Sequence, residues 1–184
     1  MQATAVLKEE HRVIERVLDA LETAANRLTT GSPVRPGVFL QAADFIKGFA
    51  DGCHHKKEEG VLFPALEAAG IPAQGGPIGV MLFEHEEGRK LTAAMRAAAE
   101  RLAAGDSSAT AEVVENALGY VALLRQHIAK EDNVLFPMAD RAIQGPAQTE
   151  LTAAFARVEH EETGLGVHER FLALADAIER EVAQ

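Results

Sequence analysis

Apolar side chains recur every three or four residues over most of the chain, which is the spacing of one face of an α-helix. Stretches with this pattern cover about residues 7–28, 39–62, 78–102 and 113–135. Short segments rich in glycine and proline separate them, at 31–37, 70–77, 105–108 and 145–146. Four amphipathic helices joined by short loops predict an all-α fold, an up-down-up-down four-helix bundle over residues 1–145.

The helical pattern resumes after the bundle and continues nearly to the end of the chain. We expect residues 146–184 to form an additional C-terminal helix, bent or broken near Gly164 and Gly166. This helix would pack on the bundle, or against a second copy in a homodimer. A sharper alternative is that His160 or His168 swings toward the bundle, as an extra ligand or to close access to a site there.

The apolar face of each bundle helix is interrupted by side chains that bind metals. The first and third helices each carry a lone histidine, and the second and fourth each carry a histidine followed four residues later by a glutamate. The set comprises His11, His54, Glu58, His85, His127 and Glu131. Burying such groups without partners costs on the order of 1–3 kcal/mol each, and more for a carboxylate. A metal centre removes this cost, so the set predicts a metal site where the helices meet.

The same two-helix unit occurs twice in the chain. HHKKEEGVLFP at 54–64 aligns without a gap with HIAKEDNVLFP at 127–137. The helix that contains His11 aligns in the same way with the helix that contains His85. Two such units can pack about a pseudo-twofold axis. The residues that each unit contributes then meet at the centre.

Four imidazoles and two carboxylates suit two metal ions better than one, with two histidines end-on to each ion and both carboxylates bridging. Mixed nitrogen and oxygen ligation of a bridged pair favours iron, with manganese and zinc as lesser options. The competing interpretation is a metal-free bundle whose histidines and glutamates pair with one another, which is a costly arrangement when buried. A ferritin-like di-iron bundle is excluded, because its Glu-x-x-His motif does not occur in the sequence.

The order of these residues, with Leu-Phe-Pro after each His-x-x-x-Glu motif, resembles the hemerythrin-like, HHE cation-binding family over about residues 5–140. The resemblance implies that the six residues ligate two non-haem irons in an oxo- or hydroxo-bridged centre, with O2, NO or peroxide as the small ligand. Oxygen-carrying members have five histidines, three of them on one iron. With four histidines in register, this chain is more similar to bacterial members associated with nitric oxide, oxidative stress and iron–sulfur cluster repair.

Two further side chains are candidates for roles just outside the ligands. On an α-helix His55 points about 100° away from His54, and its counterpart in the repeat is Ile128. His55 is the nearest candidate for a missing metal ligand, but these two features favour a position behind the ligands or at an interface. Tyr120 lies two turns before His127 and either donates a hydrogen bond to a bound oxygen species or is an ordinary core residue.

Charge and composition narrow the function further. The chain of 184 residues has a formal net charge of −10, which repels phosphate backbones, so nucleic-acid binding is not expected. No apolar run approaches the length of a membrane span, and the N-terminus shows no signal-peptide pattern. Cys53 is the single cysteine and cannot form an internal disulfide. These features indicate a cytoplasmic protein that does not enter membranes.

The sequence thus predicts a metalloprotein that binds or reacts with O2, NO or peroxide, for sensing, stress protection or iron handling. The alternative is an enzyme, a di-iron NO or peroxide reductase or an iron–sulfur cluster repair factor, which would turn over with an electron donor. A structural bundle without metal is a third possibility. No nucleophile triad, phosphate loop or dinucleotide fingerprint accompanies the histidines.

Overall fold

Four helical arms make up the body of the protein, whose computed structural model describes residues 2–163 and 166–183. The first arm is α1 (Thr4–Thr29) and the third is α4 (Pro77–Ala103). The second arm runs through α2 (Gly37–Phe45), η1 (Ile46–His55), η2 (Glu58–Leu62) and α3 (Phe63–Ala68). The fourth arm runs through η3 (Ser107–Ala109), α5 (Thr110–Lys130), η4 (Glu131–Leu135) and α6 (Phe136–Ala142). The described residues form helices and no strand, so the predicted all-α class is confirmed.

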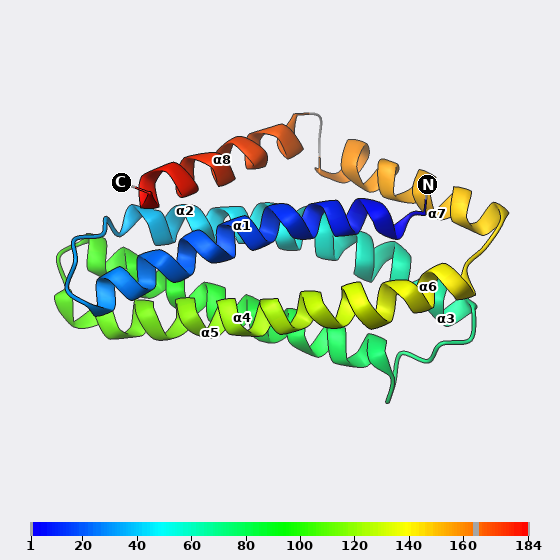
Figure 1. Cartoon of the computed structure of the whole chain (residues 1–184), viewed down its shortest axis with the longest axis horizontal. Coiled ribbons are helices and arrows are strands. Elements are labelled where there is room, and N and C mark those ends of the chain that lie inside the picture. Colours follow the sequence, from blue (N-terminus) through cyan, green and yellow to red (C-terminus); the bar gives the residue numbers. More distant parts are fainter. Residues whose placement is uncertain (1, 164–165, 184) are drawn as a thin grey trace.

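Consecutive arms run in opposite directions (Figure 1). The helix α1 lies against α2 and α5, and α4 lies against the same two helices. The four arms therefore form a square in which α1 faces α4 across the centre and α2 faces α5. This arrangement is the up-down-up-down bundle that the sequence predicts.

The hydrophobic core is divided into two clusters by the predicted metal-binding residues. On α1, Leu7 belongs to one cluster and Ile14 to the other, with His11 between them. On α4, Met81 and Met95 belong to different clusters on either side of His85. On the second and fourth arms, too, the residues before the His-x-x-x-Glu motif belong to one cluster and those after it to the other. The polar residues thus lie at one level of the bundle, with apolar packing above and below.

Three segments of the ligand-bearing arms, η1, η2 and η4, are π-helical, with hydrogen bonds from each N–H to the carbonyl five residues earlier. Both η2 and η4 end two residues before a proline, Pro64 or Pro137. Proline lacks the N–H, and its ring clashes with the carbonyl four residues earlier. The helix therefore widens ahead of each proline and then continues as α3 or α6.

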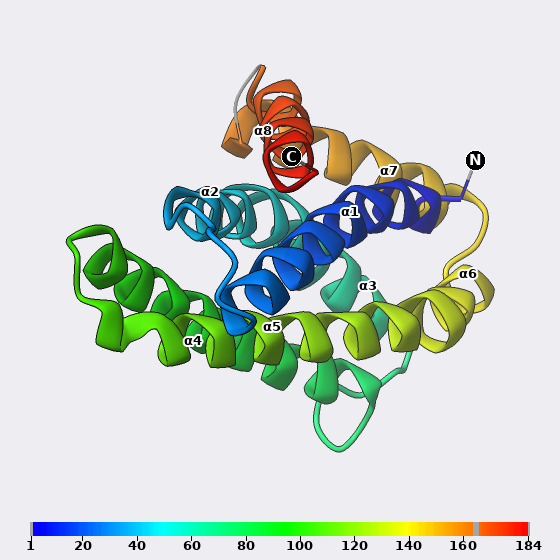
Figure 2. The ribbon, with the colours of Figure 1, turned by 60° about the vertical axis from the view of Figure 1, so that its left-hand side comes forward.

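The C-terminal extension folds as two helices rather than one, α7 (Pro146–Arg157) and α8 (Val167–Val182), with the π-helical η5 (Val158–Thr163) after α7. The predicted break is found: Gly166 has a φ of 77°, a left-handed conformation that favours glycine. Gly164 lies outside the described residues. Figures 1 and 2 show α8 lying across α1 and α2, as the contacts between these helices also indicate. The division into a bundle and an extension near residue 145 stays a prediction.

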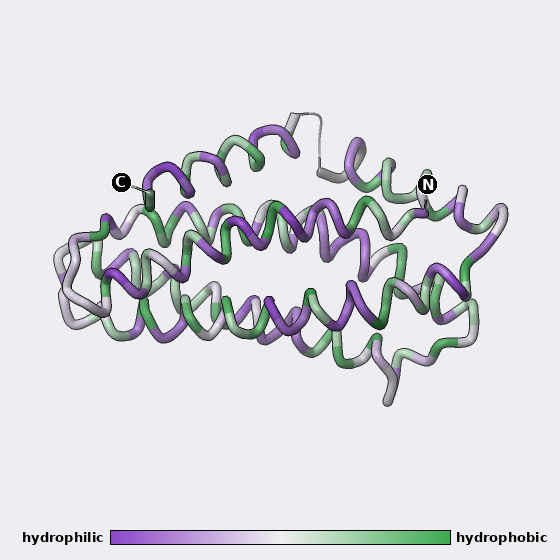
Figure 3. Tube along the Cα trace, viewed as in Figure 1, coloured by the Kyte–Doolittle hydropathy of each residue, from purple (hydrophilic) through white to green (hydrophobic). Residues whose placement is uncertain are grey.

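Hydrophobic and hydrophilic residues alternate along the helices (Figure 3), as expected when one face is buried and the other is wet. Among the side chains that the structure describes, the large apolar ones that are exposed are those of Val80, Leu82, Phe83 and Val134. Among the described helices, none combines the length and the apolar character that crossing a lipid bilayer requires.

Candidate metal centre

The residues that interrupt the apolar faces meet in the middle of the bundle, where every arm contributes at least one of them. Their ligand-capable atoms form two groups, and within each group the atoms lie within 4.8 Å of one another. One group is His11, His54, Glu58 and Glu131, and the other is His55, Glu58, His85 and His127. All of these residues are buried, and none is more than 3 % exposed.

Two carboxylates span the two groups. Glu58 places Oε1 3.5 Å from Nε2 of His54 and Oε2 3.4 Å from Nε2 of His85. Glu131 places Oε2 3.1 Å from Nε2 of His11 and Oε1 3.3 Å from Nε2 of His127. Each glutamate thus reaches a histidine of its own unit and a histidine of the other unit. Carboxylates placed in this way can bridge two metal ions.

Every histidine of the centre turns its second ring nitrogen, Nδ1, outward to a carboxylate. The acceptors, in the order of the histidines along the chain, are Asp132 (2.8 Å), Glu10 (3.0 Å), Asp51 (2.9 Å), Glu59 (2.7 Å) and Glu84 (3.0 Å). A carboxylate at Nδ1 fixes the ring orientation, leaves the lone pair on Nε2 and makes that nitrogen a better metal ligand.

The outer carboxylates are themselves paired with cations. The pairs are Asp132 with Arg12, Glu10 with Lys57, Asp51 and Glu59 with Arg89, and Glu84 with Lys130. Lys57 is completely buried, whereas 40 % of the side chain of Lys130 is exposed. The positive charges outside the carboxylates balance a site that would otherwise be strongly acidic.

The innermost atoms fit a pair of bound cations. Within the described part of the chain, Nε2 of His11, Nε2 of His54 and both carboxylate oxygens of Glu58 and Glu131 have no hydrogen-bond partner. An imidazole that donates from Nδ1 offers only a lone pair from Nε2, so it cannot satisfy a facing carboxylate. Buried groups in this condition are costly. Metal ions between them would satisfy nitrogen and oxygen lone pairs together.

Without a metal, protonated histidines neutralise part of the negative charge of the carboxylates. Burial lowers the pKa of His11 and of His85. The carboxylates close to each ring, Asp132 and Glu131 for His11 and Glu58 and Glu59 for His85, outweigh burial and raise each pKa to about 9. Burial and the neighbouring imidazoles depress the pKa of His55 well below its usual value, so this ring is neutral. A metal that enters must displace the protons from His11 and His85.

His55 lies inside the second group, although the sequence favoured a position just outside the ligands. Its ring stacks on His85 with centroids 3.8 Å apart, and Asp51 accepts the hydrogen bond from its Nδ1. The reason is the π-helical form of η1, whose wider turn separates successive side chains by less than the 100° of an α-helix. His54 and His55 therefore both face the centre. Five imidazoles converge there, whereas the repeat predicts four.

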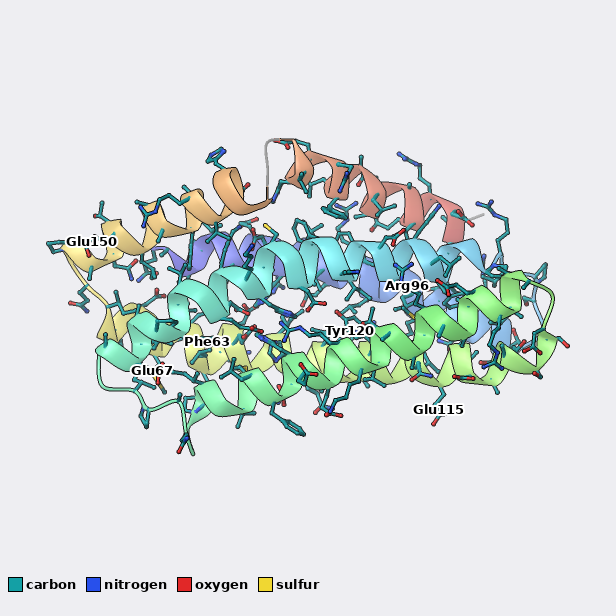
Figure 4. All side chains as sticks on the ribbon, turned by 180° about the vertical axis from the view of Figure 1, so that it is seen from behind. Phe63, Glu67, Arg96, Glu115, Tyr120 and Glu150 are labelled. Carbon is teal, nitrogen blue, oxygen red and sulfur yellow. The ribbon has the colours of Figure 1, made fainter. Side chains whose placement is uncertain are left out.

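The remaining predicted residues lie further from the centre. Tyr120 lies inside the bundle (Figure 4). In the same view Phe63 is also buried, whereas Glu115 lies on the outer surface. Tyr120 is 1 % exposed, and its hydroxyl has no hydrogen-bond partner among the described residues. The side chain of His160 is exposed.

His168 is half-buried and lies one layer behind His54. Its ring packs on Phe49 with centroids 5.2 Å apart, and it forms a group with Glu10 and Cys53. Cys53 is buried, and burial together with Glu10 raises the pKa of its thiol to about 11. This thiol is therefore uncharged, as a small core residue would be.

Sequence reasoning missed the outer carboxylates, although the repeat contained a signal for four of them. Glu10 and Glu84 directly precede the lone histidines, and Glu59 and Asp132 directly follow the bridging glutamates. Both pairs are retained between the two units. Glu59 and Asp132 suggested a solvated face, and nothing in the sequence shows that any of the four would reach a histidine on another arm. Asp51 has no acidic counterpart in the repeat and gave no such signal.

Comparison with known proteins finds relatives of most of the chain. An uncharacterized protein of Mycobacterium tuberculosis strain H37Rv is 28 % identical over 158 residues, which cover 86 % of this chain and 61 % of that protein. An uncharacterized protein of Mycobacterium bovis matches with the same identity and coverage. The chain thus spans about three fifths of the length of these relatives.

A further relative carries a functional name. The iron–sulfur cluster repair protein YtfE of Musicola paradisiaca is 32 % identical over 96 residues, which cover 51 % of this chain and 42 % of that protein. No solved structure matches the chain. The family comparison is broader, because the hemerythrin HHE cation-binding domain matches residues 2–139, which include every residue of the two groups. The chain therefore belongs to the hemerythrin HHE cation-binding domain family.

Proposed function

We propose that the protein holds two non-haem irons at this centre and binds or reacts with O2, NO or peroxide there. The observation that supports the proposal most strongly is the inward convergence of five imidazoles around two spanning carboxylates, with every Nδ1 held from outside. Mixed nitrogen and oxygen donors at a bridged pair favour iron. Iron held by these residues would supply the redox chemistry that a diatomic or peroxide ligand requires.

The two groups differ in the number of imidazoles that they offer. His55, His85 and His127 belong to one group, whereas His11 and His54 belong to the other. An ion with fewer protein ligands keeps more open positions for an exogenous ligand. We therefore assign small-ligand binding to the side of His11 and His54. Three histidines in one group and two in the other also match the five-histidine pattern of the oxygen-carrying members of the family. Four histidines would not match it.

Apolar rings from one end of the bundle pack directly on two histidines of the centre. The ring of Phe136 stacks on His11 with centroids 5.3 Å apart, and Phe63 stacks on His85 at 6.0 Å. Both phenylalanines belong to the hydrophobic cluster at one end of the bundle. Dry surroundings suit an uncharged diatomic ligand and limit its protonation.

The test is the visible absorption of the anaerobically reduced protein, with iron quantified per chain, before air, after air and after renewed removal of O2. Two irons per chain and charge-transfer bands that reverse on deoxygenation are expected for reversible O2 binding. Irreversible bands would move the assignment to NO or peroxide chemistry. Glu58→Ala should lose the bands and iron, whereas His160→Ala, an exposed histidine, should keep both. A wild-type protein that takes up no iron would contradict the proposal.

A second candidate is supported by the relative named as an iron–sulfur cluster repair protein. In that case the centre acts as part of a repair factor or as an NO or peroxide reductase. Repeated turnover with a chemical reductant would support the enzyme, and a single stoichiometric event would support the binding protein. A cytoplasmic location and a homodimer, both expected from the sequence, remain part of the proposal.

A further inference from the structure

The segment η1 presents two adjacent histidines to the centre, and it is intrinsically weak. Its sequence, IKGFADGCHH, contains Gly48 and Gly52, and glycine is the least favourable helical residue after proline. The π-helical form is also rare outside short functional stretches. A segment with these properties needs support from elsewhere in the fold to keep His54 and His55 facing inward.

The C-terminal extension packs directly on η1. The ring of Phe171 on α8 lies against the backbone of Gly48, so closely that a Cβ at residue 48 would overlap the ring. Phe171 also packs edge-on against Phe45, with centroids 6.3 Å apart. One turn earlier on α8, His168 covers Phe49. Gly48 therefore serves as the seat of α8 on the ligand-bearing arm.

A charged contact joins the extension to the same place. Glu159 of η5 lies 3.4 Å from Nζ of Lys57. Lys57 pairs with Glu10, which accepts the hydrogen bond from Nδ1 of His54. Oε1 of Glu159 is also 3.5 Å from Nδ1 of His168. The extension thus reaches a centre histidine through two intervening side chains.

The other half of the repeat shows what the same arm looks like without this cover. Residues 119–128 align with η1 and lie within α5, a regular α-helix. Ile128 stands where η1 has His55. Lys130, the counterpart of the buried Lys57, is 40 % exposed. The half that α8 covers is π-helical and carries the extra histidine, whereas its counterpart is α-helical and lacks it.

We propose that the C-terminal extension is a positioning element of the metal centre: by seating Phe171 on Gly48 and Glu159 on Lys57, it holds η1 in the wide helical form that makes His55 a ligand. Loss of this docking lets η1 return to a regular α-helix, in which His55 turns away from His85. The centre then changes from five histidines to four. This inference rests on the proposed metal pair and adds a regulator of its ligand set.

The test is nitrogen NMR of the histidine rings in zinc-loaded protein, because zinc is diamagnetic and each metal-bound ring nitrogen has a distinct shift. In the wild type we expect five rings with bound Nε2, and His55→Gln identifies the signal of His55. Phe171→Ala empties the seat, and Gly48→Ala displaces Phe171 from it. In both variants we expect the His55 signal to move to the unbound position while the other four stay bound.

Matched controls separate positioning from general stability. Ile178→Ala removes a buried side chain two turns further along α8, and Asp176→Asn removes the ion pair with Arg16 on α1. Both should keep five bound rings, as should the conservative Phe171→Leu. Glu159→Gln, at a partly exposed position, tests the charged contact and should move the His55 signal the same way by a smaller amount.

The outcomes are distinct. If His55 stays bound in Gly48→Ala and Phe171→Ala, the extension does not position it and the inference is wrong, although the metal pair stands. If the wild type shows no bound ring, the proposed metal pair fails and the inference fails with it. Should Phe171→Ala not fold, Gly48→Ala and Glu159→Gln decide: an unmoved His55 signal in both overturns the inference.

Discussion

Lys57 and Lys130 occupy equivalent positions in the repeat, and they offer a matched measurement of burial. Each pairs with the glutamate that precedes a lone histidine, Glu10 or Glu84. Lys57 is fully buried and its partner is 3 % exposed, whereas the side chain of Lys130 is 40 % exposed. Methionine in place of either lysine keeps most of the apolar stem and removes the charge.

The two substitutions should differ severalfold in their effect on the free energy of unfolding. Lys57→Met leaves the buried carboxylate of Glu10 without its cation, and breaking a buried pair from one side costs about 3–5 kcal/mol. Lys130→Met breaks a solvent-screened pair, which costs up to about 1 kcal/mol. Adding Glu10→Gln to Lys57→Met should recover part of the loss, because the unbalanced charge is then gone.

The assay is urea unfolding of the metal-free protein, followed by circular dichroism at neutral pH and low salt. With a slope of roughly 1–3 kcal/mol per molar urea, Lys57→Met should lower the midpoint by about 1 M or more. Lys130→Met should lower it by a small fraction of that. Equal losses in the two variants would refute the argument that burial makes the pair of Lys57 with Glu10 the more costly one to break.

Three other outcomes follow from the centre. Glu59→Gln removes the carboxylate at Nδ1 of His85 and should lower iron affinity by about 10–100-fold. Glu86→Gln, on the exposed side of α4, should leave the affinity unchanged. Competition with a coloured chelator measures both affinities. Because the folded-state pKa values of His11 and His85 are raised to about 9, their protonation stabilises the metal-free fold fully below about pH 6.5 and is lost as pH rises through about 9. Iron affinity should rise over the same interval as protons are displaced, and calorimetry in two buffers of different ionisation enthalpy should show that release; identical heats would contradict it. Tyr120→Phe removes a hydroxyl with no partner among the described residues, so urea unfolding of the metal-free protein should show stability unchanged or raised by about 1 kcal/mol, and a loss of that size would reveal a partner.

The repeat and the helical spacing were sufficient to predict the architecture and to predict that six residues of the candidate centre lie close together. His11 and His85 lie on apolar faces whose period fixes where they point, and the paired motifs place Glu58 and Glu131 one turn beyond their histidines. These inferences depend only on α-helical geometry over short distances. The histidine and glutamate of each pair remain close although η1, η2 and η4 are π-helical.

The sequence favoured a position for His55 just outside the ligands, and the structure places it among them on η1, a π-helical segment. The sequence shows Gly48 and Gly52 but not the ring of Phe171, which lies more than a hundred residues further along the chain. Likewise Asp51 reaches its histidine within its own helix, yet its role depends on the orientation that η1 gives to that ring. Helix phase is set here by tertiary packing, which local propensity does not encode.

The division of the hydrophobic core by the centre determines how the bundle opens. Because a polar layer separates the cluster around Leu7 and Phe136 from the cluster around Ile14 and Phe49, apolar packing does not run continuously from one end of the molecule to the other. Ions in that layer would tie the ends into a single cooperative unit, and their removal would leave two foldons that exchange amide hydrogens at separate rates. The bound metal would then determine the cooperativity of unfolding as well as the chemistry. Loss of the metal would be detectable as separate unfolding of the two ends of the bundle.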